Sequence, residues 1–159
     1  MSEPQYIEML AGVDAQGSPI IEKIPVHIND QNECELAHSP AFVKGVARGD
    51  LLKLNSETQQ FEVKKRSGNL CVRVFCRGDI DRLGDNIAPE LEKLGGQLDL
   101  ATPRMLVYSI HVSCGFNAIE NIFNRHCQSG ESGWIYGNVY DPNDGATPLN
   151  WWAKILQPE

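Results

Sequence analysis

The chain has 159 residues, of which 42% are hydrophobic and 22% charged, values that exclude a disordered chain and a coiled coil. Fourteen Lys and Arg residues against twenty-one Asp and Glu residues give a formal net charge of −7. Nucleic acids and anionic membranes are bound by cationic surfaces, so we expect neither partner. An acidic surface favours a basic protein partner, although the same charge also keeps a small domain soluble.

The first half of the chain has the pattern of β-strands. Segments 6–12 and 20–28 flank a run of turn formers, which is typical of a β-hairpin. Pro25 favours an edge position for the second of these strands. Segments 46–54 and 60–66 predict a further strand pair, and the polar segment 30–35 between the pairs is expected to be a loop. We therefore predict that residues 1–69 form an antiparallel β subdomain, either a sheet or a partial barrel.

The second half alternates between strand and helix patterns. Apolar residues recur at helical spacing over 80–94, with Asp79 as the N-cap, and again over 116–127. Gly84 and Pro89 are expected to interrupt the first of these helices, and Gly95-Gly96 to end it.

Four strand-like segments frame the two helices, at 70–76, 97–100, 104–112 and 134–140. The resulting order is β-α-β-β-α-β, which is typical of a ferredoxin-like unit. We predict an α+β fold in which residues 70–159 form this unit beside the N-terminal sheet. Residues 70–140 should build one four-stranded antiparallel sheet with both helices on the same face.

The most distinctive stretch, residues 38–50, reads His-Ser-Pro-Ala-Phe-Val-Lys-Gly-Val-Ala-Arg-Gly-Asp and is followed by a Ser-Gly-Asn turn at 67–69 and by Arg73. This layout resembles a bacterial family of small proteins described as a domain of unknown function. In that family a Pro-Phe turn leads to a Gly-x-x-x-Gly-Asp turn, a Ser-Gly turn and an Arg-bearing strand. Here Ala41 stands between the proline and the phenylalanine. The resemblance covers roughly residues 20–140 and implies no catalytic residues.

The cysteines and the first residues predict a cytosolic protein with reduced thiols. Residues 1–10 contain no apolar run of signal-peptide length, and no segment approaches the roughly 20 apolar residues of a spanning helix. An odd number of cysteines without a Cys-x-x-Cys pair argues against disulfides and against a metal site. The five expected free thiols are Cys34, Cys71, Cys76, Cys114 and Cys127.

Cys114 is the candidate for an enzymatic nucleophile. It precedes a predicted helix, and a helix N-terminus favours the thiolate. His111 lies close in sequence, but on an extended strand the two side chains would point to opposite faces. An inert thiol is therefore the alternative interpretation. No phosphate-binding, dinucleotide-binding, zinc-protease or serine-hydrolase motif occurs, so we expect no cofactor.

Two groups of acidic residues are candidate protein-binding sites, one around the first predicted helix and one after the last strand. Acidic groups beside Trp and Tyr suit a basic partner, although exposed acids and core aromatics are the alternative. Of the adjacent Trp151 and Trp152, we expect Trp152 to be exposed. The candidate residues are Asp79, Asp81, Asp85, Asp141, Asp144 and Trp152.

These observations lead to a functional hypothesis with two alternatives. The chain is expected to be a non-enzymatic, acidic protein-binding module of a bacterial cytosol, such as an immunity protein or an inhibitor that masks a basic toxin or effector. The first alternative is a small-molecule-sensing module, because ferredoxin-like sheets often bind ligands on one face. The second is a cysteine-dependent enzyme that uses Cys114. The sequence leaves the oligomeric state open.

Overall fold

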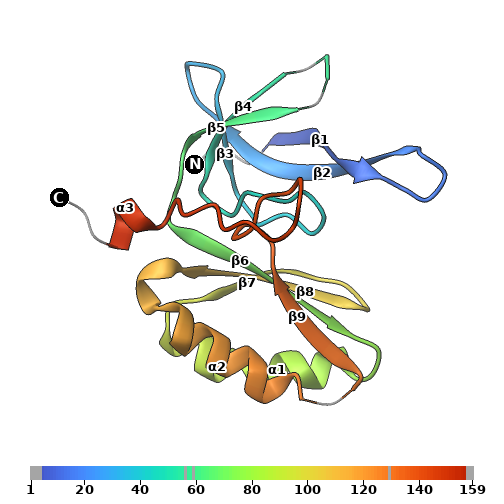
Figure 1. Cartoon of the computed structure of the whole chain (residues 1–159), viewed down its shortest axis with the longest axis vertical. Helices are drawn as coiled ribbons and strands as arrows, with labels where there is room; N and C mark the ends of the chain where they lie inside the picture. Colours follow the sequence, from blue (N-terminus) through green and yellow to red (C-terminus); the bar gives the residue numbers. More distant parts are fainter. Residues whose placement is uncertain (1–4, 56, 59, 129, 157–159) are drawn as a thin grey trace.

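The fold consists of two antiparallel sheets, one above the other, with two helices beneath the lower sheet (Figure 1). The computed structural model describes residues 5–55, 57–58, 60–128 and 130–156. Residues 1–4, which belong to the segment expected to lack a leader, lie outside the described residues. The predicted α+β class and the N-terminal antiparallel sheet are confirmed.

The first sheet has five strands in the order β1-β2-β3-β4-β5, so each strand pairs with its neighbours in sequence. The strands are β1 (Gln5–Val13), β2 (Pro19–Ile28), β3 (Cys34–Leu36), β4 (Leu51–Leu54) and β5 (Phe61–Lys65). β3 begins inside the segment expected to be a loop, and it forms because Cys34 and Leu36 are both buried against the sheet's core.

Pro25 lies on an inner strand, so the expected edge position is wrong. Its carbonyl accepts the amide of Ala37 at 2.9 Å, and Ala37 follows the last residue of β3. The missing N–H of the proline therefore faces Ala37, just past the end of β3, and this pair makes one hydrogen bond instead of two.

The second sheet has four antiparallel strands in the order β7-β8-β6-β9 and is the predicted ferredoxin-like sheet. Its elements are β6 (Asn69–Cys76), α1 (Ile80–Lys93), β7 (Gln97–Ala101), β8 (Met105–His111), α2 (Phe116–His126) and β9 (Ser132–Tyr136). A short 3₁₀ turn, η1 (Val112–Cys114), precedes α2, and a single helical turn, α3 (Ala153–Leu156), lies near the C-terminus. β6 begins at the boundary expected between the two units; their status as separate subdomains stays a prediction.

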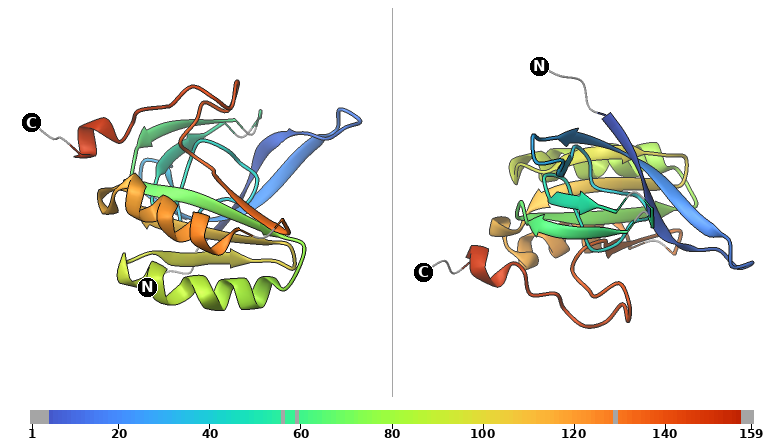
Figure 2. Two further views of the ribbon diagram at one scale, coloured as in Figure 1. Left: turned by 60° about the horizontal axis from the view of Figure 1, so that its bottom comes forward. Right: turned by 90° about the horizontal axis from the view of Figure 1, so that it is seen from above.

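Both helices cover the same face of the second sheet, as predicted (Figure 2, left). Alternate residues of β6, including Leu70, Val72 and Val74, are buried in one cluster with the apolar stripes of the helices. The stripes consist of Ile80, Leu83, Ile87 and Leu91 on α1, and of Ile119, Ile122 and Phe123 on α2. On the opposite face of β6, Cys71 and Arg73 are buried toward the first sheet, whereas Phe75 near the end of the strand is exposed.

The expected interruption of the first helix is wrong, because α1 is continuous through Pro89. Asp79 caps the helix by accepting the amide of Arg82 at 3.1 Å, as predicted. The helix ends at the Gly95-Gly96 pair, where the amide of Gly96 donates to Leu91 O at 3.0 Å. No helix in the described part of the chain is long and apolar enough to cross a membrane.

Candidate functional site

Segment 37–50, which contains the distinctive motif, fills the space between the two sheets. Val43 and Val46 are buried in the core of the first sheet. Ala41 and Ala47 instead pack against Cys71 on the second sheet. The motif residues therefore join the two layers into one structure.

Two opposite charges hold the first part of this segment. The carboxylate of Glu22, on β2, accepts the amides of residues 41–43 at 2.7, 2.9 and 2.9 Å. From the other side, the buried guanidinium of Arg73, on β6, donates to Pro40 O at 3.2 Å and also to Val43 O. The anion thus contacts the donors of the segment and the cation contacts its acceptors. We call this arrangement the Glu22–Arg73 clamp.

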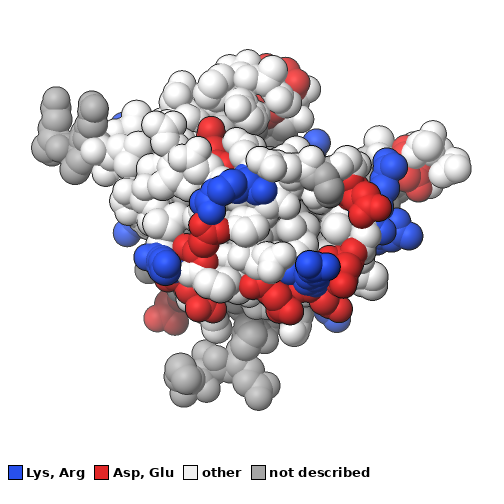
Figure 3. All heavy atoms as spheres, turned by 90° about the horizontal axis from the view of Figure 1, so that it is seen from below, with Lys and Arg blue, Asp and Glu red and all other residues white. Residues whose placement is uncertain are grey.

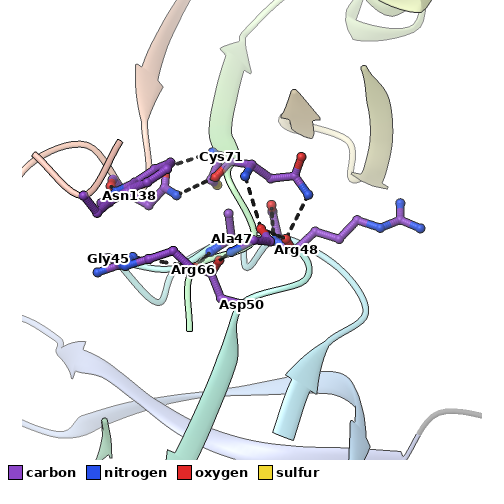
Figure 4. A network of polar contacts seen from close by, with 11 residues as sticks. Gly45, Ala47, Arg48, Asp50, Arg66, Cys71 and Asn138 are labelled. Atoms are coloured by element: carbon purple, nitrogen blue, oxygen red, sulfur yellow. Dashed lines mark hydrogen bonds and ion pairs between the residues drawn. The ribbon is translucent and has the colours of Figure 1, made fainter. Parts of the chain in front are cut away.

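Another carboxylate, that of the buried Asp50, holds the end of the segment (Figure 4). Asp50 is 1% exposed and accepts the amides of Ala47 at 3.0 Å and Ser67 at 2.8 Å. Burial raises the pKa of the Asp50 carboxyl, while these amides and the Arg66 cation, 3.6 Å away, oppose the rise. Arg66 also donates to Gly45 O. These contacts fix the position of Gly45 and of the residue before it.

An open cleft of about 450 Å³ lies beside β9, the last strand in the order of the second sheet. We call it the β9 cleft. It brings together β9, helix α2, the turn after β9 and segment 37–50. The residues that line it are Lys44, Glu120, Trp134, Ile135, Tyr136, Gly137, Tyr140, Asp141, Pro142 and Gly145.

Direct contacts between segment 37–50 and the turn after β9 define one end of the cleft. The amide of Gly45 donates to Gly137 O at 2.8 Å. A Cβ atom at Gly45 would lie 3.3 Å from Pro142 Cγ, and the φ of Gly45 is +93°, so glycine suits this close approach.

The inner wall of the cleft is aromatic. The rings of Trp134 and Tyr136 meet edge to face with their centroids 5.0 Å apart. Tyr136 packs in the same way on Phe116 at 5.8 Å, and Phe116 packs on Trp152 at 5.3 Å. Each of these contacts adds rigidity to the wall, because aromatic pairs prefer this edge-to-face geometry.

Two carboxylates face the cleft with unused acceptor capacity. Glu120 accepts the hydroxyl of Tyr136 at 2.9 Å through Oε2, and Asp141 accepts the amide of Asn143 at 2.8 Å through Oδ1. No donor from the described residues contacts the other oxygen of either carboxylate. Burial, and then the bond to Glu120, raises the pKa of Tyr136, which keeps its hydroxyl protonated as a donor. Lys44 is the one cation among the described lining residues.

The second predicted acidic group, Asp141 and Asp144, lies in one turn, but only Asp141 lines the cleft. Asp144 is engaged within the turn. Its Oδ1 accepts the amides of Ala146 and Thr147 at 2.8 and 2.9 Å, and its Oδ2 accepts the Thr147 hydroxyl. These bonds lower the pKa of Asp144 to about 2.

The first predicted acidic group lies elsewhere. Asp79, Asp81 and Asp85 are exposed on or beside α1 and do not line the β9 cleft. On the helix-covered face, acidic and basic side chains are interspersed (Figure 3), and the exposed cations Arg82 and Arg125 belong to its two helices. The structure therefore separates the two groups that the sequence offered as alternatives.

Trp152 is half-buried, so the expectation that it is the exposed member of the tryptophan pair is wrong. Trp151 is half-buried as well, donates through Nε1 to Asn138 O at 2.9 Å and lies under the Arg66 guanidinium at 5.6 Å. Both rings pack because the chain folds into a turn here rather than an extended tail. Trp152 supports the cleft from behind, through Phe116.

Cys114 and His111, the residues considered for cysteine chemistry, do not hydrogen-bond to each other. The thiol of Cys114 donates to Leu94 O at 3.1 Å, whereas His111 Nδ1 bonds to the Ser113 hydroxyl at 2.8 Å. All five cysteines are free in the structure. Among the described residues, no group of three or more His, Cys, Asp or Glu side chains is placed to hold a metal ion.

Sequence reasoning missed Glu120 and Lys44. Glu120 follows Phe116 by one helical turn, so its position beside the apolar stripe was a weak signal that it could reach the sheet. Nothing in the local sequence indicates that Lys44 would meet the turn after β9, because that contact depends on the fold of segment 37–50.

Comparison with known proteins agrees with this fold. A solved structure, described as a novel crystal structure of a hypothetical protein from Neisseria gonorrhoeae, is similar with a TM-score of 0.68 and 13% sequence identity, covering 86% of this chain and 96% of that one. No curated protein matches the chain. Residues 22–134 match the family described as a domain of unknown function, DUF4265, and this match spans more than half of the chain. The chain therefore belongs to the DUF4265 family.

Proposed function

We propose that this protein is a non-enzymatic binding module that masks a basic segment of a partner protein in the β9 cleft. The observation that carries the proposal is the pair of cleft carboxylates, Glu120 and Asp141, each with an oxygen that no described donor contacts. A Lys or Arg side chain from a partner would supply the missing donors through charge-assisted hydrogen bonds.

The aromatic wall supports the same proposal. Trp134 and Tyr136 offer a rigid apolar surface beside the carboxylates, and Tyr140 is 42% exposed at the rim. Binding hot spots combine such aromatic surfaces with charges that lose their water on binding. The net charge of −7 would also speed the approach of a basic partner.

An immunity protein or inhibitor in a bacterial cytosol fits this binding mode. Such a protein needs only to cover a basic surface of a toxin or effector, and it requires no reacting group of its own. The acidity of the chain and the two-layer frame around the cleft meet that requirement.

The test is quantitative capture of partners from a lysate of the source bacterium, at low and at high salt. The cleft variant is Glu120→Gln/Asp141→Asn, and the control is Asp81→Asn/Asp85→Asn, which removes as many charges from α1. The captured basic protein is then purified, and its association rate with each variant is measured. The cleft variant should slow association and flatten its salt dependence, while the control behaves like the wild type. Loss of binding in the control alone, or no stoichiometric partner at either salt, would count against the proposal.

A small-molecule-sensing role is the second candidate, because the cleft volume of about 450 Å³ falls in the range of ligand pockets. A thermal-shift screen separates the two. A ligand at about 100 times its dissociation constant would stabilise the fold by roughly 2.7 kcal/mol. A stabilising small molecule whose effect is lost in Glu120→Gln/Asp141→Asn would favour this candidate.

A further inference from the structure

The open edge of β9 presents backbone groups to the cleft. The amide of Gly137, the residue after β9, donates to Cys71 O at 2.7 Å, which places these two residues opposite each other as the next bonded pair beyond the end of the β6–β9 register at Val72 and Tyr136. Because such pairs alternate in an antiparallel ladder, Ile135 bonds to β6, whereas the N–H and C=O groups of Trp134 and Tyr136 point away from it.

The β6–β8 ladder shows independently which residues of β6 bond to which neighbouring strand. The amide of Val112 donates to Gly68 O at 2.8 Å, so Leu70 and Val72 bond to β8, and Cys71 and Arg73 bond to β9. The outward direction of the Trp134 and Tyr136 backbone groups therefore follows from both neighbours of β6.

We propose that the partner segment binds as an extended strand that pairs antiparallel with β9 and adds a fifth strand to the second sheet. This inference rests on the function proposed above and specifies how the cleft is used. Peptides that add to a sheet edge gain affinity from main-chain hydrogen bonds and specificity from alternate side chains. Here both the backbone groups of Trp134 and Tyr136 and the carboxylates lie at the same edge.

The two faces of the sheet specify the side chains of the segment. A residue opposite Tyr136 lies on the same sheet face as the Tyr136 ring, whose hydroxyl contacts Glu120 at 2.9 Å. A Lys or Arg side chain at this position reaches that carboxylate. A residue opposite Ile135 lies on the other face, where Ile135 is 47% exposed and Phe75 is 39% exposed. The segment therefore carries a basic residue opposite Tyr136 next to an apolar residue opposite Ile135.

Charge argues against a second copy of this chain as the occupant. Pairing β9 with β9 of another molecule would bring two cleft carboxylate pairs together, each on a chain of net charge −7. Like charges at an interface suppress association, whereas a basic strand complements them.

The probe is the peptide acetyl-Thr-Lys-Val-Lys-Thr-amide, titrated into the ¹⁵N-labelled protein at low salt. In the antiparallel arrangement the amides of both lysines bond to β9 and the amide of valine points away. N-methylation of the lysine amides should weaken binding by about tenfold or more, while N-methylation of valine leaves it nearly unchanged. The largest chemical-shift changes should fall on the amides of Trp134 and Tyr136. Equal effects of the two N-methylations, shifts concentrated on other elements, or no binding would overturn the strand-addition mode.

A side-chain variant tests the same mode without relying on the peptide backbone. Ile135→Lys places a cation at the edge opposite the basic segment and should weaken binding by about tenfold, whereas Val13→Lys, on a more exposed residue of the β1–β2 hairpin, should not. If the captured partner protein is insensitive to Ile135→Lys but sensitive to Glu120→Gln/Asp141→Asn, strand addition is wrong and the masking function stands. If it is insensitive to both, the masking function at this cleft is wrong as well. Concentration-dependent dimerisation that Ile135→Lys abolishes would assign the edge to a second copy and overturn the proposal.

Discussion

Replacing Arg73 with methionine tests the Glu22–Arg73 clamp. Methionine keeps most of the length of the side chain but removes two hydrogen bonds from a charged donor, to Pro40 O and Val43 O. Each such bond contributes roughly 1.5–3 kcal/mol, and removal of a buried cation recovers part of that loss, so we expect a net cost of about 3 kcal/mol in the free energy of unfolding. For a chain of this size the melting temperature should fall by about 6–12 °C.

A double-mutant cycle with Glu22→Gln asks whether the two charges act on the same segment. Once Arg73 is replaced, segment 40–43 is already loosened, so the second substitution should cost less than it does alone. We expect an interaction energy of about 1 kcal/mol or more, measured by urea unfolding followed by circular dichroism.

The control for the cycle is Arg77→Met. Arg77 is exposed just after the same strand, and its replacement should change stability by less than about 0.5 kcal/mol. Additivity of Arg73→Met and Glu22→Gln to within about 0.3 kcal/mol would show that the clamp is two separate contacts, and our reasoning would be refuted.

Three further predictions concern individual residues. Gly137→Ala places a Cβ 2.6 Å from Cys71 Sγ and should cost about 1–3 kcal/mol in the free energy of unfolding, whereas Gly133→Ala, with no atom within 4 Å, should be nearly neutral. The Asp144 carboxyl should titrate at about pH 2 by NMR. Because this folded pKa lies below the ordinary value of 3.8, the ionised carboxylate stabilises the turn fully above pH 3.8. This stabilisation is lost as the pH falls through about 2, and Asp144→Asn should remove the pH dependence. Alkylation at neutral pH, followed by mass spectrometry, should find Cys71 among the slowest thiols, because burial raises its pKa.

Much of the second sheet could be predicted from hydrophobic periodicity. The stripes of α1 and α2 are long and regular, so their burial against one sheet face followed directly from spacing. The first helix continues through Pro89 because Ile87 and Leu91 on either side are buried, and their packing outweighs the lost backbone bond. β3 was missed because it has only three residues, and its pairing with β2 and β4 is not visible in local sequence.

The candidate site could be predicted only in part. Asp141 was found because it follows the predicted last strand, 134–140, and because acids next to Trp and Tyr stand out in a sequence. Glu120 and Lys44 were not found, since their meeting with the turn depends on how α2 and segment 37–50 pack on the second sheet. The wrong expectation for Trp152 came from treating the tail as extended, whereas the turn at 150–152 lets both tryptophans pack.

The region matched by the family covers the whole clamp but only part of the β9 cleft. Residues 22–134 begin at one residue of the clamp and include the other, so the clamp lies within the matched region. The turn that carries Asp141 lies beyond it. We therefore expect other members to hold segment 37–50 in the same way, and a structure of another member can check this.

Hydrogen–deuterium exchange of the protein alone and in complex with the captured partner tests the β9 cleft most directly. The strand and the turn that line the cleft, residues 132–136 and 140–145, should exchange more slowly in the complex, while residues 79–85 of the α1 acidic group should not change. Slowed exchange confined to 79–85, with β9 unaffected, would contradict the assignment of the binding site to the β9 cleft.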